Sequence, residues 1–499
     1  MKAISLQRIL WVALFFSCPL WAASAIENTA PGASDESLSQ SLLRVNSTNQ
    51  VYEFFQPWIK KPPFSRRGIG ALLDGGRILV TAELVANSTF IEIEKPAGTK
   101  KSSAVVERID YTCNLAVLRP VDSAFLEGMK PLDLNGPLRV GDEATVLQLE
   151  PNGDIARTLG LITSISVGSY PAESGLFLLF KLGAPLQQRD GSFTLPAIHK
   201  GRLIGMVMRY DLRNQSADIV PTAVIRHFLE GIDSPAYRGF GRLGISFAPL
   251  RDPQLRRFIG LQESGGIYVT DLAPRGPASI AGIKKRDVIL AVDGLPIDQD
   301  GNYEDPEYGR ILFSHLTNTI KYPGDVLPFK ILRDGKVLEI PVTIQAADRE
   351  DSIIDEHLFD EPPKYVILGG LVFMELSRPY LKEWGAKWTS NAPQRLVYYD
   401  AFQNELPADR GRIVILSQVL PTSDTIGYQD LDNIVVTKLN GKPVKSLADL
   451  SEAAKQPVDG FQKIEFEEDP KFLILDAASI EAHAETLKEH YAIPSLERL

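Results

Sequence analysis

Short apolar runs separated by turn residues recur along most of the chain, and they predict strands far more often than helices. Between residues 68 and 229 the clearest runs, rich in β-branched residues, are 77–81, 90–93, 115–118, 144–149, 176–181 and 203–208. Many short strands of this kind predict an all-β barrel or sandwich.

A different pattern occupies residues 265–297. Two β-branched runs, 267–269 and 288–292, each predict a strand, and the small residues 277–282 between them predict a short helix closed by a glycine. Asp293-Gly294 predicts a tight turn out of the second strand. This order of elements resembles the centre of a PDZ domain. PDZ domains take an extended peptide as an extra strand on an open sheet edge and hold its C-terminal carboxylate on backbone N–H groups.

The flanks extend the PDZ-like pattern to a whole domain over residues 236–345. Residues 309–319 predict a helix beside the peptide groove. We favour a usable groove over one filled by the protein's own chain, because a candidate carboxylate-binding loop is present. That loop supplies the predicted peptide-binding residues Gly241, Arg242, Leu243, Gly244 and Ile245.

The region before this domain resembles the trypsin-like protease domain of the HtrA/Deg family, in particular its plant-type branch. The matching segments follow in the family's order: 68–72, 77–79, 113–118, 138–142, 201–205 and 220–222. The end of the chain resembles the second, atypical PDZ-like domain of plant-type Deg proteins, on the runs 369–373, 377–381, 415–420 and 439–441. It shows no carboxylate-binding loop, so we expect a structural or assembly role for it.

The resemblance implies a mainly β fold, with a trypsin-like double β-barrel domain followed by two PDZ-like domains. The expected protease domain spans residues 41–235, and the second PDZ-like domain spans residues 364–499. Residues 346–363 are acidic and end in two prolines, which predicts a linker between the two PDZ-like domains.

Serine proteolysis, the family's activity, needs a hydroxyl nucleophile, a histidine base and an acid that orients the histidine. Carried over by position, the histidine falls on Glu83, and its neighbours Ala82 and Leu84 are not histidines either. The aspartate falls on Asn114. An asparagine can hydrogen-bond an imidazole but cannot stabilise an imidazolium by charge. The resemblance therefore implies that two triad members are missing.

The nucleophile falls in the loop of residues 191–196. Anchoring on the first and last residues of this loop puts Phe193 at the nucleophile, and a slip by one puts Ser192 there. In either register the two glycines that aim backbone N–H groups at an oxyanion are absent. His199 is the histidine nearest to Ser192 in sequence, and Glu83 could act as a base only if burial raised its pKa.

Charge and composition narrow the choice of partners. The 63 acidic and 53 basic residues give a formal charge of −10, which argues against nucleic acid or an anionic membrane as partner. The histidines and cysteines show no metal-ligand spacing, and no cofactor is expected. Of the two cysteines, Cys18 lies in the leader, so we expect Cys113 to be a buried thiol without an intrachain disulfide.

The N-terminus carries the marks of a secretory signal peptide. Lys2 and Arg8 precede the apolar run 9–21, and residues 23–25 form an A-x-A cleavage site. We expect cleavage after residue 25, which leaves no membrane span, and we expect the small, polar residues 26–40 to be disordered. Export of a chain with one remaining cysteine suits the bacterial periplasm.

We therefore interpret the sequence as a secreted HtrA/Deg-like pseudoprotease of the cell envelope. Its expected work is to bind peptides or unfolded proteins through the first PDZ-like domain, as a chaperone-like protein or a scaffold. Two alternatives stay open: an active serine endopeptidase that uses Ser192 with a non-standard base, and a structural assembly subunit. HtrA relatives assemble through their protease domains, commonly as trimers. The resemblance thus implies a homo-oligomer or a mixed oligomer with an active relative.

Overall fold

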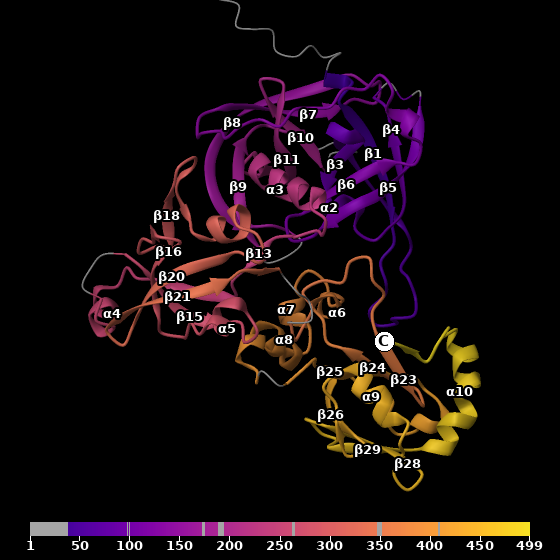
Figure 1. Cartoon of the computed structure of the whole chain (residues 1–499). Helices are drawn as coiled ribbons and strands as arrows, with labels where there is room; N and C mark the ends of the chain where they lie inside the picture. Colours follow the sequence, from indigo (N-terminus) through magenta and orange to yellow (C-terminus); the bar gives the residue numbers. More distant parts are fainter. Residues whose placement is uncertain are drawn as a thin grey trace, which may run out of the picture.

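The computed structural model describes residues 38–96, 98, 100–171, 175–187, 194–261, 265–346, 352–407 and 410–499. Figure 1 shows a pair of β-barrels at the top, a first sheet-containing domain at the lower left and a second at the lower right. The expected signal peptide and residues 26–37 lie outside the described residues. Leu38, which the composition assigned to a disordered segment, is instead 1% exposed in the core.

The first barrel is closed and has the strand order β1-β2-β3-β6-β5-β4. Its strands are β1 (Leu42–Asn49), β2 (Phe64–Leu73), β3 (Arg77–Thr81), β4 (Ser88–Glu94), β5 (Lys101–Asp110) and β6 (Leu115–Pro120). Gly70 lets β2 approach β3 closely, because a Cβ there would lie 2.6 Å from Cγ2 of Ile78. Cys113, just before β6, is fully buried, as expected.

The second barrel is also closed, with the order β10-β11-β12-β9-β8-β7. Its strands are β7 (Glu143–Leu149), β8 (Ile155–Ser169), β9 (Leu176–Gly183), β10 (Leu195–His199), β11 (Arg202–Asp211) and β12 (Ser216–Pro221). The helix α3 (Thr222–Asp233) follows and packs against β9, β11 and β12. The six apolar runs read from the sequence all fall on strands of these two barrels, so the expected double barrel is confirmed.

The first PDZ domain follows the predicted order of elements. Its main sheet has the order β14-β15-β16-β20-β21, built from β14 (Ile245–Pro249), β15 (Ile267–Leu272), β16 (Val288–Val292), β20 (Val326–Arg333) and β21 (Lys336–Thr343). The predicted short helix is α5 (Pro277–Ala281), which ends at Gly282 with φ 93°. A left-handed residue of this kind is what glycine tolerates at a helix end.

The predicted helix over residues 309–319 is wrong in its first half. Residues Gly309–Leu312 form strand β19, which pairs with β18 (Asn302–Asp305), and the helix covers only 314–320. The Asp305 carboxylate accepts hydrogen bonds from the N–H groups of Glu307 and Tyr308 at 2.9 and 3.0 Å. This Asx turn closes a hairpin that the helical expectation overlooked.

The second PDZ domain has the sheet order β29-β28-β26-β25-β24-β23-β30. The strands are β23 (Tyr365–Leu368), β24 (Leu371–Glu375), β25 (Val414–Val419), β26 (Ile434–Leu439), β28 (Phe461–Phe466), β29 (Phe472–Asp476) and β30 (Glu497–Arg498). Three short helices lie between β24 and β25: α6 (Arg378–Lys382), α7 (Trp388–Asn391) and α8 (Gln394–Ala401). Later come α9 (Leu447–Ala454) and α10 (Ala477–Tyr491).

The first PDZ domain is docked on the second barrel through aromatic rings. His227 of α3 stacks between Phe240 and Tyr322, with ring centroids 4.4 and 3.9 Å away. The amide of Asn318 donates to the carbonyl of Leu176 at 3.1 Å. Because buried stacking of this kind resists separation of the two surfaces, we treat the barrels and the first PDZ domain as one packed unit.

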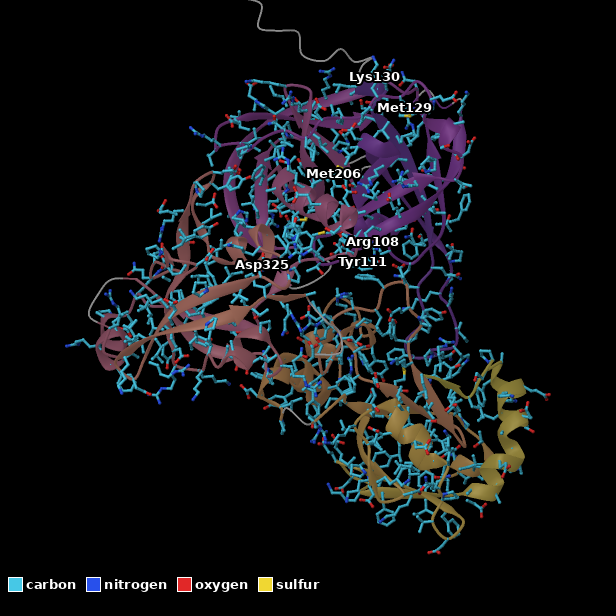
Figure 2. The ribbon with its side chains drawn as sticks, in the orientation of Figure 1. Arg108, Tyr111, Met129, Lys130, Met206 and Asp325 are labelled. Atoms are coloured by element: carbon cyan, nitrogen blue, oxygen red, sulfur yellow. The ribbon has the colours of Figure 1, made fainter. Side chains whose placement is uncertain are left out.

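A loop of the first barrel reaches the second PDZ domain. Residues 50–63 join β1 to β2, and Figure 1 shows this indigo loop extending down toward the C-terminus. The Phe55 ring meets Trp384 edge-on at 4.9 Å, and Lys61 Nζ lies 2.6 Å from a Glu383 carboxylate oxygen. The underside of the barrel, where Figure 2 labels Arg108 and Tyr111, also faces the later domains.

Candidate functional site

The structure brings together the two triad positions that it describes. The one-turn helix α2 (Ala82–Val85) presents Glu83, and Asn114 lies in the left-handed region at φ 54° just before β6. The Asn114 side-chain amide donates to Glu83 Oε2 at 3.2 Å, and its Oδ1 accepts from the Glu83 backbone N–H at 3.1 Å. The Ala82 N–H donates to the Asn114 carbonyl at 3.0 Å. The two loops are therefore locked to each other without an imidazole between them.

Two arginine charges act on the Glu83 carboxylate. Burial raises the pKa of Glu83, and the hydrogen bond from Asn114 and the charges of Arg66 and Arg209 oppose that rise. Arg66 also donates to the Glu83 backbone carbonyl, and burial lowers the pKa of this arginine. In the described part of the chain, no histidine contacts Glu83 or Asn114. No described histidine therefore stands beside the position at which the sequence predicted the base.

The nucleophile loop is described only at its C-terminal flank. Ser192 and Phe193 lie outside the described residues. The next residue, Thr194, is fully buried, and its carbonyl accepts from the Ile69 N–H at 2.9 Å. His199 lies with Nδ1 2.6 Å from the Glu143 carbonyl, so its ring is tied to β7.

The first PDZ domain has an open groove. β14 is an edge strand of its sheet, so backbone groups along one side are available to an added strand. The carbonyls of Leu243 and Gly244 accept from Ala278 and Ala273 at 3.1 and 2.9 Å, which fixes the loop. Within the described residues the N–H groups of Leu243 and Gly244 donate to no partner. Two free, fixed N–H groups suit a carboxylate.

The predicted carboxylate-binding loop opens into a cavity of about 600 Å³, a size typical of ligand sites. The predicted loop residues Gly241, Arg242, Leu243, Gly244 and Ile245 all line it. The groove itself contributes Phe247 of β14, together with Phe313, Ser314, Thr317 and Asn318. The cavity is also bounded by residues from outside this domain: Thr112, Gly175, Leu176, Phe177, Ser352, Ile353, Asp355, Glu356, His357, Gln403 and Asn404.

The second PDZ domain fills the corresponding groove with its own chain. β23 pairs antiparallel with β24 through a hairpin whose turn residues, Gly369 and Gly370, have φ of 60° and 102°. β23 also contacts α9, and Val366 is buried in one cluster with Leu447 and Leu450. The outer edge of β23 is covered in turn by β30. A peptide strand therefore finds no free edge on β24.

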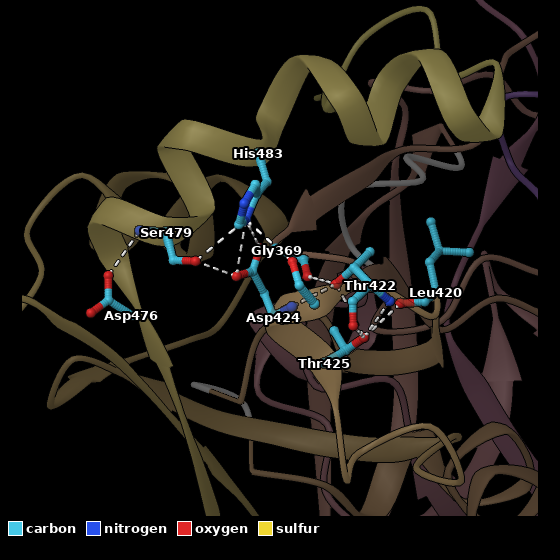
Figure 3. A network of polar contacts seen from close by, with 9 residues as sticks. Gly369, Leu420, Thr422, Asp424, Thr425, Asp476, Ser479 and His483 are labelled. Carbon is cyan, nitrogen blue, oxygen red and sulfur yellow. Dashed lines mark hydrogen bonds and ion pairs between the residues drawn. The ribbon is translucent and has the colours of Figure 1, made fainter.

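Figure 3 shows Ser479 and His483 of α10 meeting Asp424 of the loop after β25, a group that the sequence analysis did not single out. His483 Nδ1 lies 3.0 Å from an Asp424 carboxylate oxygen and 3.3 Å from Ser479 Oγ. A serine nucleophile needs the other ring nitrogen as its base, because the acid occupies Nδ1. Here both partners share Nδ1, so the group fastens α10 to the loop after β25 and does not form a catalytic triad.

No helix in the described part of the chain has the length and apolar character needed to cross a membrane. Two matches to the PDZ domain cover residues 241–344 and 354–497. Among solved structures, a variant of the HtrA-type protease AlgW with a decapeptide aligns at a TM-score of 0.50 and 18% identity, over 63% of this chain and 97% of that chain. At that identity the likeness concerns the fold alone.

Curated relatives cover nearly the whole chain. Protease Do-like 4, mitochondrial, of Arabidopsis thaliana is 28% identical over 487 residues, which are 95% of this chain and 89% of the relative. Protease Do-like 2, chloroplastic, of the same plant is 28% identical over 472 residues, which are 92% of this chain and 75% of the relative. Together with the double barrel and the two PDZ matches, these relatives place the chain in the HtrA/Deg-like serine protease family, as a member with two PDZ domains.

Proposed function

We propose that this protein is a catalytically inactive member of its family. It binds C-terminal peptide ends or unfolded chains in its first PDZ domain and works as a chaperone-like protein or a scaffold in the cell envelope. The observation that carries the proposal is the pair of hydrogen bonds between Glu83 and Asn114. These residues occupy the predicted positions of base and acid, and they are hydrogen-bonded to each other, while β14 keeps a free sheet edge for a peptide strand.

The inactive reading is supported by the chemistry of the substituted positions. A serine hydroxyl needs a base to accept its proton. One carboxylate oxygen of Glu83 already accepts a hydrogen bond from the Asn114 side-chain amide. Asn114 cannot supply the negative charge that stabilises an imidazolium. Replacing both members removes the base and its support together, so we expect no turnover above the background of peptide bond hydrolysis.

The peptide-binding reading is supported by the loop and the edge strand. Leu243 and Gly244 present N–H groups for a carboxylate, and β14 offers the ladder for an added strand. The apolar rings of Phe247 and Phe313, 5.6 Å apart, line the cavity where the last side chain of the peptide would lie. We therefore expect ligands with a free C-terminus and an apolar last residue.

Fluorescence anisotropy on the purified protein tests this binding. The probe is a set of labelled decapeptides ending in Val, Leu, Ile or Phe, each with a free or an amidated C-terminus. Gly244→Ala should weaken binding at least tenfold, because Gly244 has φ 70° and a Cβ there would lie 2.9 Å from the Ala273 Cβ. Gly335→Ala is the matched control, since Gly335 has φ 74° but open space around its Cβ position. Equal affinity for amidated peptides, or for Gly244→Ala, would contradict the proposal.

An active endopeptidase is the second candidate, because burial raises the pKa of Glu83 toward the range of a general base. Labelling of purified protein by a fluorophosphonate probe, together with casein hydrolysis, separates the two candidates. We expect neither signal. Labelling that disappears in both Ser192→Ala and Glu83→Gln would establish an active enzyme with a carboxylate base.

Assembly and location are part of the same proposal. We expect a homo-oligomer or a mixed oligomer with an active relative, which mass photometry of the purified protein would detect. A purely structural subunit would assemble in the same way. In that case the wild-type protein and the Gly244→Ala variant would bind the decapeptides equally weakly. Fractionation of the native cell should find the protein in the envelope.

A further inference from the structure

A segment of the expected linker, residues 352–360, contacts the first barrel and the second PDZ domain and borders the peptide cavity of the first PDZ domain. It is called the strap here. We propose that the strap is an autoinhibitory element, which competes with peptides for access to the first PDZ groove. It is released when a peptide binds. This inference rests on the peptide-binding function proposed above and assigns a regulation to that site.

The strap forms part of the wall of the peptide cavity. Ser352, Ile353 and residues 355–357 line the same cavity as the carboxylate-binding loop. The loop and the strap come from segments about 110 residues apart in sequence, so their meeting is a property of the tertiary fold alone. A chain end that enters the loop has to share this space with the strap.

The N-terminal half of the strap is anchored in the second PDZ domain. Ile354 is fully buried in that domain's core, and the Asp355 carbonyl accepts from the Arg378 N–H at 2.8 Å. An ion pair of 2.9 Å joins Asp355 to Arg412, and one of 3.2 Å joins Glu356 to Arg378. This half therefore moves with the second PDZ domain.

The C-terminal half is latched to the first barrel through Asp360. Its Oδ1 accepts from the Asn87 N–H at 2.7 Å, its own N–H donates to Asn87 Oδ1 at 2.9 Å, and its Oδ2 accepts from the Tyr111 hydroxyl. The rings of Tyr111, Phe359 and His357 form a stack with centroid distances of 4.3 and 4.9 Å. The Asp360 side chain is the polar core of this contact.

The latch joins the strap to the loops of the degenerate triad. Asn87 follows the helix that carries Glu83, and Tyr111 precedes Asn114 by three residues. Asp360 adopts φ 60°, a conformation that a free, unbonded aspartate would leave. The strap is thus held at one end by exposed hydrogen bonds and partly exposed stacked rings, while its other end is buried. This asymmetry is what a releasable element requires.

Competition between strap and peptide predicts how the apparent Kd for peptide should change. If the docked strap excludes peptide, the apparent Kd equals the intrinsic Kd divided by the fraction of molecules with the strap released. Removing the Asp360 side chain deletes two hydrogen bonds to a charged acceptor, so the released fraction should rise about tenfold or more. By linkage, a bound peptide must weaken strap docking by the same factor.

The test uses the full chain and the tightest decapeptide from the anisotropy set. Asp360→Ala should bind it about tenfold more tightly than wild type, and Tyr111→Phe, which keeps the ring stack, should give a smaller gain in the same direction. Asp459→Ala is the matched control, because Asp459 is exposed at φ 53° in the turn between α9 and β28 of the second PDZ domain. It should bind as wild type does.

A second readout follows the strap itself. Hydrogen exchange of residues 353–360, measured by mass spectrometry, should accelerate in wild type when the decapeptide is added, and should already be fast in Asp360→Ala. Unchanged affinity in Asp360→Ala, or slower exchange of the strap with peptide bound, would overturn the strap proposal without contradicting the proposed peptide binding. If no variant binds any decapeptide, the proposed function fails and the strap proposal fails with it.

Discussion

The bidentate contact between Arg333 and Asp287 offers a sharp test of what holds the first PDZ domain together. The Asp287 side chain is 1% exposed, and it accepts from Arg333 Nε at 2.7 Å and from Nη2 at 2.6 Å. Its remaining donor is the Lys284 N–H at 2.7 Å. The contact joins the start of β16 to the end of β20, so it fastens the turn after α5 to the sheet.

Arg333→Leu leaves a buried carboxylate with one backbone donor and no counter-charge. Removing one partner of a buried pair costs about 3–5 kcal/mol, because the remaining charge stays desolvated. Adding Asp287→Asn to this variant removes the stranded charge but keeps an acceptor for Lys284. The double variant should therefore recover a large part of the loss, even though it carries one more substitution.

Hydrogen exchange of amides in β16 and β20 measures the local free energy of opening. Arg333→Leu should accelerate their exchange by roughly 150-fold to 5,000-fold, the factor that corresponds to the expected loss. Arg251→Leu is a matched control in the same domain, since the Arg251 side chain is 71% exposed and pairs with Asp300 at the surface; it should leave the rates unchanged. The reasoning is refuted if the double variant exchanges faster than Arg333→Leu alone.

Three further predictions concern stability and docking. Burial lowers the pKa of His315 to about 4, so its neutral form stabilises the fold above pH 6.5. The free energy of unfolding should therefore fall by about 2 kcal/mol between pH 7 and pH 5 in wild type but not in His315→Phe. Hydrogen exchange of the helix over 314–320 measures this loss. Gly205→Ala should destabilise the second barrel by about 1–3 kcal/mol in thermal unfolding, because its Cβ would lie 2.2 Å from the Val220 carbonyl oxygen, whereas Gly136→Ala meets no atom within 4 Å and should be neutral. Lys61→Met should speed proteolysis of the loop over residues 50–63 roughly twofold to fivefold, because Glu383 loses the cation it pairs with. Burial already raises the pKa of Glu383. An unchanged rate would show that the aromatic contacts alone hold the loop.

The two PDZ domains differ in whether the sheet edge beside the peptide groove is free. In the first, the segment β13 (Gly241–Arg242) pairs with β22 (Gln345–Ala346) and leaves β14 as an edge. In the second, the equivalent segment folds back as β23 and covers its own neighbour β24. The difference lies in the turn, since a two-glycine hairpin closes where the first domain keeps an open loop. The first domain therefore keeps a free sheet edge, whereas the second has its edge covered and contacts residues 354–356 and the loop over residues 50–63.

Local patterns fixed many elements because the forces that form them act over a few residues. The strand over residues 77–81, the helix closed by Gly282 and the turn at Asp293-Gly294 all appear where the apolar spacing and the turn residues predicted them. The helix over residues 309–319 failed in its first half, because the Asp305 side chain stabilises a hairpin that periodicity alone does not reveal. Turn chemistry outweighed periodicity there.

By itself the amino-acid sequence determined the predicted substitution of the catalytic positions by Glu83 and Asn114, since that prediction depends on residue identity and not on folding. Only the tertiary structure decided that these two residues bond each other, that β23 fills the second groove, and that Asp360 closes on Asn87 across 273 residues of chain. Such contacts arise when separate cores pack and bring distant backbone groups into hydrogen-bond reach. No local pattern encodes that proximity, because a contact between distant residues is specified by the whole arrangement of the domains around it.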